Sequence, residues 1–121
     1  MAAHIETGRR GEEIARNLLH KKGYKILETN WRWGRNEIDI IAQDQQFLVF
    51  VEVKTRHSNA LMEPAAAVTR DKQQNLIRAA NAYIINKNNP LEARFDIVTV
   101  LLNKEPAEIT HIIDAFYPTL R

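Results

Sequence analysis

The segment that most restricts the fold is "FLVFVEVKTR", residues 47–56. Its first five residues are apolar, so both faces of an extended strand would be apolar there, as in the middle of a covered sheet. Glu52 and Lys54 then follow two residues apart, on the face that alternation gives to Leu48 and Phe50. A carboxylate at the end of such a strand is at least partly desolvated. Its burial costs on the order of several kcal/mol unless a cation, a partner or a proton compensates.

The sequence on either side of this strand predicts a small α/β fold. Thr7 can cap a first helix that runs to about Lys22 and stops at Gly23, and a second long helix is expected from Thr69 to Asn88. The polar segment "HSNALMEP" before the second helix predicts a loop. Strands are expected at residues 24–33, 36–43, 46–56, 94–102 and 108–116, with the second and third as an antiparallel pair. The order α-β-β-β-α-β-β predicts an α/β sandwich in which helices flank a mixed central sheet.

Length and composition exclude several classes of protein. A chain of 121 residues is long enough for one core, so we expect a single domain over residues 1–121. The absence of cysteine excludes disulfides, thiolate metal sites and cysteine nucleophiles, and Ser58, the only serine, lacks the elbow motif of a serine hydrolase. No stretch approaches the roughly 20 apolar residues of a membrane span or forms a signal peptide, so we expect a cytoplasmic protein without membrane association.

Positive charge gathers at one end of the chain. Residues 1–36 carry eight Lys and Arg against four Glu, although the whole chain has a net charge of only +2. Such clustering suits a polyanion such as nucleic acid, but a solvated basic surface is the commoner cause of a local excess.

A second acidic segment, "NEIDII" at residues 36–41, neighbours the central strand in the expected hairpin. Alternation puts Glu37 and Asp39 on one side, and Asp39 comes near Glu52 if the hairpin register sets the two opposite each other. The turn residues alone do not fix that register. Carboxylates beside Lys54 suit Mg²⁺, which prefers oxygen ligands, and phosphodiester hydrolysis is the reaction that fits best. For any single E-x-K, a cross-strand salt bridge is the commoner explanation, whereas D-x12-E-x-K on paired strands is more specific.

The first helix brings one more carboxylate toward this region. On a helical wheel Glu12 falls at the edge of the apolar face, and Glu13 points away from it. That apolar face is formed by Ile14, Ala15, Leu18 and Leu19 and is shared by Gly8 and Gly11.

The stretch "GRRGEEIARNLLHKKGYKILETNWRWGRNEIDIIAQDQQFLVFVEVKTR", together with the later "RFDIV", resembles the YraN family of small bacterial proteins within the PD-(D/E)XK nuclease superfamily. The resemblance covers nearly the whole chain, and its members are similar in fold to archaeal Holliday junction resolvases. It implies a restriction-endonuclease-like core and an endonuclease that uses Mg²⁺ or Mn²⁺ to cut DNA. Branched or single-stranded DNA in repair or recombination is the implied substrate. By analogy with two-fold resolvases, it also points to a homodimer.

The resemblance assigns roles to individual residues of this chain. Asp39 takes the aspartate position of the motif, Glu52 the second acidic position and Lys54 the lysine, with the backbone carbonyl of Val53 as a further metal ligand. Glu12 matches a helix glutamate that such nucleases often add to the site. Two positions depart from the pattern: Ile38 stands where the superfamily has proline, and Asn36 stands where the family usually has glycine. Some proteins with this core do not cut DNA, so a catalytically inactive nucleic-acid-binding protein is the alternative.

Further residues have a weaker assignment. Glu37 is an auxiliary candidate for binding a second metal, although a surface carboxylate explains it equally well. Gln73 is an auxiliary candidate for a hydrogen bond to a site carboxylate or water, although a satisfied buried amide is the better explanation. Trp31 and Trp33 are candidates for stacking on nucleic acid, with packing the better explanation for at least one, and Asp96 is expected to be a structural partner of an arginine or a backbone amide. Phosphate-binding candidates are Arg9, Arg10, Arg32, Arg35, Arg56, Arg70 and Lys72, for each of which simple solvent exposure is the alternative.

Overall fold

The computed structural model describes residues 2–57, 68–103 and 105–118, with side chains from Thr7 onward. The predicted order of helices and strands is confirmed. Apart from the start of the first helix, every boundary lies within two residues of its predicted place. The predicted loop "HSNALMEP" lies, after His57, outside the described residues. The elements are α1 (Ala2–Lys21), β1 (Lys25–Trp33), β2 (Asn36–Asp44), β3 (Phe47–Arg56), α2 (Arg70–Lys87), β4 (Glu92–Leu101) and β5 (Glu108–Phe116).

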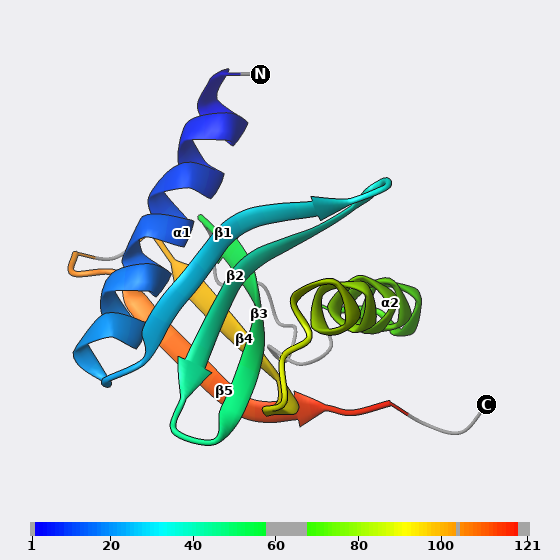
Figure 1. The fold of residues 1–121 in the computed structure, drawn as a ribbon. Coiled ribbons are helices and arrows are strands. Elements are labelled where there is room, and N and C mark those ends of the chain that lie inside the picture. Colours follow the sequence, from blue (N-terminus) through cyan, green and yellow to red (C-terminus); the bar gives the residue numbers. More distant parts are fainter. Residues whose placement is uncertain (1, 58–67, 104, 119–121) are drawn as a thin grey trace.

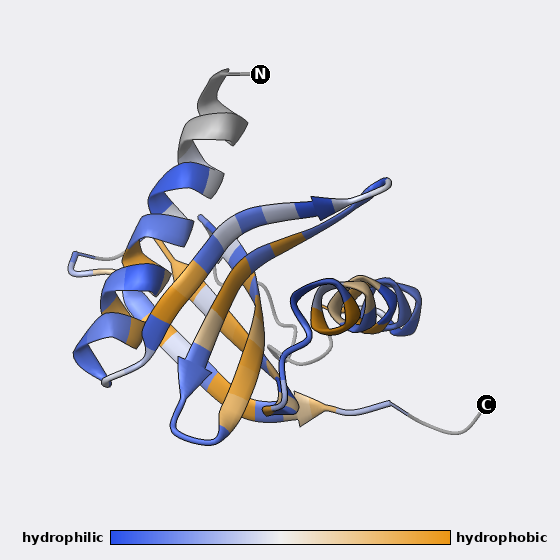
Figure 2. Ribbon diagram, viewed as in Figure 1, coloured by the Kyte–Doolittle hydropathy of each residue, from blue (hydrophilic) through white to orange (hydrophobic). Residues whose placement is uncertain are grey.

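The five strands form one mixed sheet in the order β1-β2-β3-β4-β5 (Figure 1). The pair β3–β4 is parallel, with α2 as its connection, and the other neighbouring pairs are antiparallel. β3 is therefore the central strand, as its apolar sequence predicts. Figure 2 shows the hydrophobic residues concentrated on the middle strands and on the helix sides that face them.

The two helices cover opposite faces of the sheet, so the core has two halves (Figure 1). On the α1 side, Val49 and Val51 pack with Ala15 and Leu19, which confirms the predicted apolar face of that helix. On the α2 side, a second cluster of buried residues includes Leu48, Phe50, Leu76, Ala80 and Tyr83. Glu52 and Lys54 continue the row of Leu48 and Phe50, so the site lies on the α2 side.

The predicted start of α1 at Thr7 is wrong, because the helix begins at Ala2. Alanine is the best helix former, and the residues before Thr7 offer no break that would stop the helix there. Thr7 lies inside the helix, and its Oγ1 atom is 2.9 Å from Nε2 of His57. The C-terminal end is as predicted: Gly23 has φ +93°, which glycine adopts without strain, and the N–H of Tyr24 donates to the carbonyl of Leu19.

The predicted limits of α2, about Thr69 and Asn88, are confirmed, and the structure shows a cap at each end. The hydroxyl of Thr69 accepts a hydrogen bond from the N–H of Lys72, and Asn88 ends the helix in the left-handed conformation at φ 49°. These caps fix where α2 begins over the end of β3.

No helix in the described part of the chain is long and apolar enough to cross a membrane.

A glycine lets α1 cross β3 at close range. A Cβ atom added to Gly11 would lie 1.8 Å from Oγ1 of Thr55, far inside van der Waals contact. Only glycine leaves the space that this crossing needs. The crossing places Glu12, the next residue, over the C-terminal part of β3.

Regular alternation is interrupted midway along the β1–β2 hairpin. Ile38 belongs to the core on the α2 side, whereas Ile40 belongs to the core on the α1 side. The residues paired across this point are Thr29 with Ile40 and Trp31 with Ile38, so Asp39 lies opposite Asn30, which has φ 50°. The expectation that Glu37 and Asp39 share one side rests on unbroken alternation, which does not hold here because Ile38 and Ile40 lie on opposite faces of the sheet.

Candidate functional site

The register of β2 and β3 brings Asp39 and Glu52 together. Ile40 pairs with Val51, so the next residue of each strand, Asp39 and Glu52, face each other. The N–H of Val53 donates a 2.8 Å hydrogen bond to Oδ2 of Asp39. The condition that the sequence left open, the hairpin register, is met.

Glu52 is buried without full compensation. Its side chain is only 6% exposed, and Oε2 lies 3.9 Å from Nζ of Lys54 and 3.9 Å from Nζ of Lys72. Its other oxygen, Oε1, has no hydrogen-bond partner among the described residues. Within those residues it is the one buried side-chain nitrogen or oxygen without a partner. A buried carboxylate oxygen without a donor is costly, so this atom indicates a position that another positive group is suited to occupy.

Burial and mutual repulsion make the two carboxyls hold a proton. Burial, followed by the negative charge of Glu52, raises the pKa of Asp39 to about 8, and the N–H of Val53 opposes this only in part. Burial also raises the pKa of Glu52, against the opposing charges of Lys72 and Lys54. Two carboxyls this close cannot both ionise easily, so near neutral pH the pair retains a proton that a cation can replace.

Glu12 adds a third acidic group at the edge of this pair. It is half-buried whereas Glu13 is exposed, as the helical wheel predicts. The amide of Asn30 donates a 2.8 Å hydrogen bond to Oε1 of Glu12. The charge of Glu12 contributes to the raised pKa of both Asp39 and Glu52, so the three carboxyls interact electrostatically.

Lys72 lies closer to the carboxylates of the site than its predicted role requires. The sequence predicts it as a phosphate-binding candidate near the opening of the site, and its ammonium is as close to Glu52 as that of Lys54. A signal for this was present in the sequence: Lys72 is four, seven and eleven residues before Leu76, Ala79 and Tyr83, which are buried on the core side of α2. Helical spacing thus puts Lys72 on the inward side.

The donor set fits a hard divalent cation of the magnesium type. Mg²⁺ commonly binds one or two carboxylates of a protein. Asp39 and Glu52 provide two that face each other, and one oxygen of Glu52 has no partner among the described residues. The carbonyl of Val53 belongs to the residue whose N–H already holds Asp39. Within residues 2–57, 68–103 and 105–118 no three His, Asp or Glu side chains are grouped as metal ligands, so water and phosphate oxygens would have to complete the shell.

The auxiliary candidates contact other groups. Glu37 forms an ion pair with Arg32, 3.3 Å away on β1, instead of joining Asp39. Gln73 is half-buried, and its amide nitrogen donates to the carbonyl of Val68, which makes it a satisfied amide.

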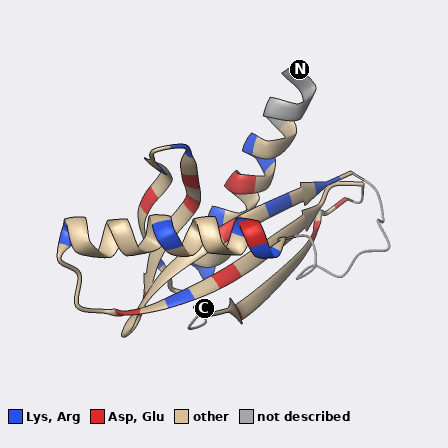
Figure 3. Ribbon diagram, turned by 90° about the vertical axis from the view of Figure 1, so that its right-hand side faces the viewer, with Lys and Arg blue, Asp and Glu red and all other residues tan. Residues whose placement is uncertain are grey.

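The basic candidates are spread over several elements (Figure 3). Arg9 is exposed on α1, and Arg10 on the same helix lies 3.7 Å from Glu105. The remaining ones are Arg32 near the end of β1, Arg35 in the turn before β2, Arg56 at the end of β3, and Arg70 at the start of α2, all exposed.

The two tryptophans have different environments. Trp31 packs edge-on against Tyr83 of α2, with ring centroids 5.1 Å apart, which is the packing expected for at least one of them. Trp33 is 45% exposed and remains accessible to a ligand.

Asp96 is the centre of a buried polar network on the α1 side of the sheet. Arg94 donates two hydrogen bonds of 3.0 Å to it, and the N–H of Asp114 donates one of 3.1 Å, so the predicted arginine and backbone partners are both present. Nε2 of His111 lies 2.8 Å from Oδ2 of Asp96, a partner that no sequence pattern indicates. The network joins β4 to β5 and is separate from Glu52.

Relatives of this chain can be compared over nearly its full length. It is 47% identical to UPF0102 protein FP2501 of Flavobacterium psychrophilum over 97% of this chain and 98% of that protein. It is 45% identical to a UPF0102 protein of Parabacteroides distasonis over the whole of both chains, and 44% identical to one of Chlorobium chlorochromatii over 93% and 92%. A family model described as uncharacterised protein family UPF0102 matches residues 11–100, a range that contains Asp39, Glu52, Lys54 and Lys72. This chain therefore belongs to the uncharacterised protein family UPF0102.

Proposed function

We propose that this protein is an endonuclease that uses Mg²⁺ or Mn²⁺ to hydrolyse DNA phosphodiester bonds, with branched or single-stranded DNA in repair or recombination as its substrate. The observation that carries the proposal is the unpartnered Oε1 of Glu52, buried opposite Asp39 with two lysine ammoniums 3.9 Å from its other oxygen. A protein that needed only a stable strand would gain by replacing such a group with an apolar residue. The resemblance to PD-(D/E)XK nucleases assigns the same residues to metal binding and hydrolysis.

In this proposal Asp39, Glu52 and the carbonyl of Val53 hold the cation. When bound, the ion would polarise the phosphodiester and stabilise the charge that develops on it. The rigid central strand contributes orientation, because Glu52 and Lys54 are fixed on one face of β3 while Asp39 is held by the N–H of Val53.

The two lysines supply positive charge from two elements. Lys54 on β3 has a side chain 34% exposed and Lys72 on α2 one 39% exposed, so both ammoniums can reach a phosphate outside while remaining near Glu52. Lys54 is suited to orient the attacking water, and both can donate to the phosphate oxygens as negative charge develops. Glu12 increases the negative potential that attracts the cation.

The test is a cleavage panel of four-way junction, flap, single-stranded and duplex DNA with Mg²⁺, Mn²⁺ or EDTA. We expect cleavage only with metal, and its loss in Asp39→Ala and Lys54→Ala. Glu13→Ala, an exposed change on α1, is the matched control and should cut like the wild type. Equal cleavage by wild type and Lys54→Ala would falsify the assignment.

One observation favours the alternative of a nucleic-acid-binding protein without catalysis. Lys54 and Lys72 already offset the charge of Glu52, and no third acidic ligand completes a metal group among the described residues. Calorimetry separates the two functions. Salt-dependent DNA binding without detectable binding of Mg²⁺ or Mn²⁺ supports the alternative, whereas metal binding that Glu52→Gln abolishes supports the endonuclease.

A further inference from the structure

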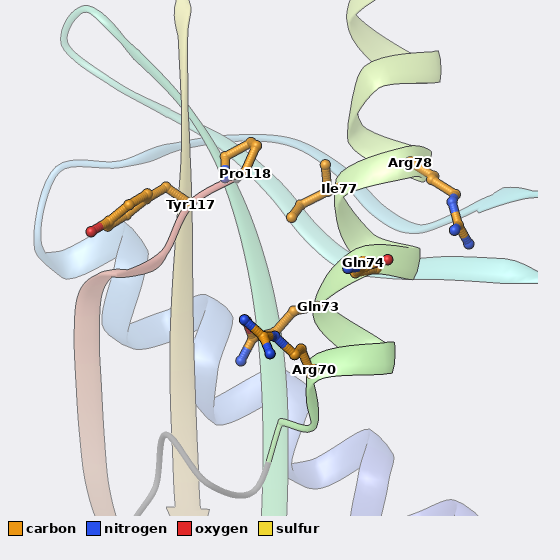
Figure 4. A pocket seen from close by; sticks show the side chains of 7 residues that line it. All are labelled: Arg70, Gln73, Gln74, Ile77, Arg78, Tyr117 and Pro118. Atoms are coloured by element: carbon orange, nitrogen blue, oxygen red, sulfur yellow. The ribbon is translucent and has the colours of Figure 1, made fainter. Parts of the chain in front are cut away.

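Two cavities lie along the exposed side of α2, and both are lined by Arg78. The first, of about 260 Å³, lies between the N-terminal half of α2 and the segment after β5, and Tyr117 and Arg70 also line it (Figure 4). The second, of about 450 Å³, lies between the C-terminal half of α2 and the β1–β2 hairpin, and Trp33 lines it. Figure 3 shows α2 crossing between that hairpin and the C-terminal segment.

The side chains around the cavities have the chemistry that binds single-stranded nucleic acid. An exposed aromatic ring stands at each end, Tyr117 at 70% exposure and Trp33 at 45%. Arg70 and Arg78 provide guanidinium groups eight residues apart, about 12 Å along a helix. No Asp or Glu of the described residues lines either cavity. Exposed rings that stack on bases, combined with cations that follow the backbone, are how proteins bind single strands.

On α2, a residue of the first cavity directly follows a residue of the candidate site. Gln73 lines the cavity, and the preceding residue, Lys72, has its ammonium 3.9 Å from Glu52. Gln73 and Gln74 add side-chain amides, which can hydrogen-bond base edges, and the amide nitrogen of Gln73 is held by the carbonyl of Val68. A strand bound in this cavity therefore contacts α2 within one helical turn of Lys72.

The hairpin beside the second cavity packs on α2. Trp31 packs edge-on against Tyr83, so the tip of the hairpin is carried out beyond the helix. Arg78 is itself positioned by a 3.3 Å hydrogen bond to Asn75 on the same helix. The hairpin that carries Trp33 and the side chain of Arg78 are thus held by contacts inside the protein.

We propose that this surface, formed by Arg70, Gln73, Gln74, Arg78, Tyr117 and Trp33, binds a single-stranded segment of nucleic acid. A base stacks on Tyr117 beside the site, the backbone passes Arg78, and a second base stacks on Trp33. Unpaired bases are required because the faces of bases inside a duplex are already stacked. The assignment of the strand to a substrate role rests on the proposed function, whereas its binding does not.

The experiment measures binding without cleavage. Fluorescence anisotropy of labelled single-stranded DNA, single-stranded RNA of the same sequence and duplex DNA is recorded in EDTA with the Lys54→Ala protein as background. We expect Tyr117→Ala and Trp33→Ala each to weaken single-strand binding about 5- to 100-fold, the range of one lost stacking interaction, with little effect on the duplex. Arg78→Ala should weaken binding and reduce the salt slope by about 1.

Matched variants control for loss of folding and of charge. Tyr117→Phe keeps the ring and should bind like the background protein. Arg16→Ala removes one cation from α1, on the opposite face of the sheet, and should leave single-strand binding within about twofold of the background.

The outcomes for the surface and for the endonuclease are separable. Single-strand binding that requires Tyr117 supports the surface even if wild-type protein never cuts DNA. Binding changes below twofold in all three alanine variants overturn it, even if cleavage with Mg²⁺ is robust. A change in self-association by light scattering in Trp33→Ala, with unchanged nucleic-acid binding, also overturns it and assigns the surface to a protein contact.

Discussion

The N–H of Val53 donates a 2.8 Å hydrogen bond to Oδ2 of Asp39, so a backbone group of the central strand fixes the carboxylate that faces Glu52. The backbone pairing of β2 with β3 ends at Ile40 and Val51. The hydrogen bond between Val53 and the side chain of Asp39 holds the two strands together beyond that pair. Because the donor is a main-chain group, every residue except proline at position 53 keeps it, and the orientation of Asp39 is a property of the strand itself.

This bond predicts different behaviour for two substitutions of Asp39. Asp39→Asn keeps an oxygen acceptor for the N–H of Val53, while Asp39→Ala leaves that N–H without it, so the alanine variant should be less stable than the asparagine variant by about 1 kcal/mol. Both remove the charge and should abolish Mn²⁺ binding. Urea unfolding and calorimetry measure the two effects. Equal stability of the two variants would contradict the role given to the bond.

Glu52 should reduce the stability of the metal-free protein. Burial disfavours its charged form and raises its pKa, so Glu52→Gln, which removes the charge at the same size, should raise the free energy of unfolding. The same variant should lose the rise in melting temperature that Mg²⁺ or Mn²⁺ gives the wild type. Calorimetric melting with and without metal checks both, with Glu13→Gln as a control that should change neither. A less stable Glu52→Gln protein would argue that the site is merely structural.

Gly11 should be intolerant of any side chain. Gly11→Ala places a Cβ 1.8 Å from Oγ1 of Thr55, so α1 must move off β3 at a cost of about 1–3 kcal/mol. The second substitution Thr55→Ala removes that oxygen, although its Cβ would remain at 2.9 Å, and should restore part of the loss. Gly8→Ala is the matched control, because an added Cβ there meets nothing within 4 Å. Unfolding free energies of the variants test this, and an unchanged Gly11→Ala protein would refute the close crossing.

The network around Asp96 predicts how stability falls in acid. Burial acts to raise the pKa of Asp96, but hydrogen bonds from His111, Arg94 and the N–H of Asp114 outweigh burial and lower the pKa below its ordinary value of 3.8. Between the pKa of Asp96 in the folded protein and 3.8, the unfolded chain binds more protons than the folded one. The stability that Asp96 contributes is therefore present above pH 3.8 and is lost as the pH falls further.

Asp96→Asn should therefore flatten the dependence of unfolding free energy on pH below about 4. It should also destabilise the protein at neutral pH by about 3–5 kcal/mol, because it leaves Arg94 buried without its main counter-charge. Other members of the network stay in place, because Tyr24 and Asp44 also contact Arg94 and Lys22 contacts His111. The control is Asp71→Asn, an exposed change of the same kind on α2. A variant whose acid unfolding matches the wild type would show that Asp96 does not set this dependence.

The chain itself determined the elements and their order. The apolar run before Glu52 predicts a central strand because both of its faces need cover, and the limits of α2 could be predicted because helix ends depend on nearby residues. Glu12 could be separated from Glu13 for the same reason, since helical periodicity is a property of neighbouring residues.

Tertiary structure decided which of these groups meet. The facing of Asp39 and Glu52 depends on a hairpin register that no turn residue specifies, and Glu37 pairs with Arg32 of β1 instead of joining them. Lys72 reaches Glu52, and His111 reaches Asp96, only because packing brings elements distant in sequence into contact. Local patterns follow from short-range sterics and hydrogen bonding, whereas these contacts follow from how the elements pack, and that is fixed by the core as a whole.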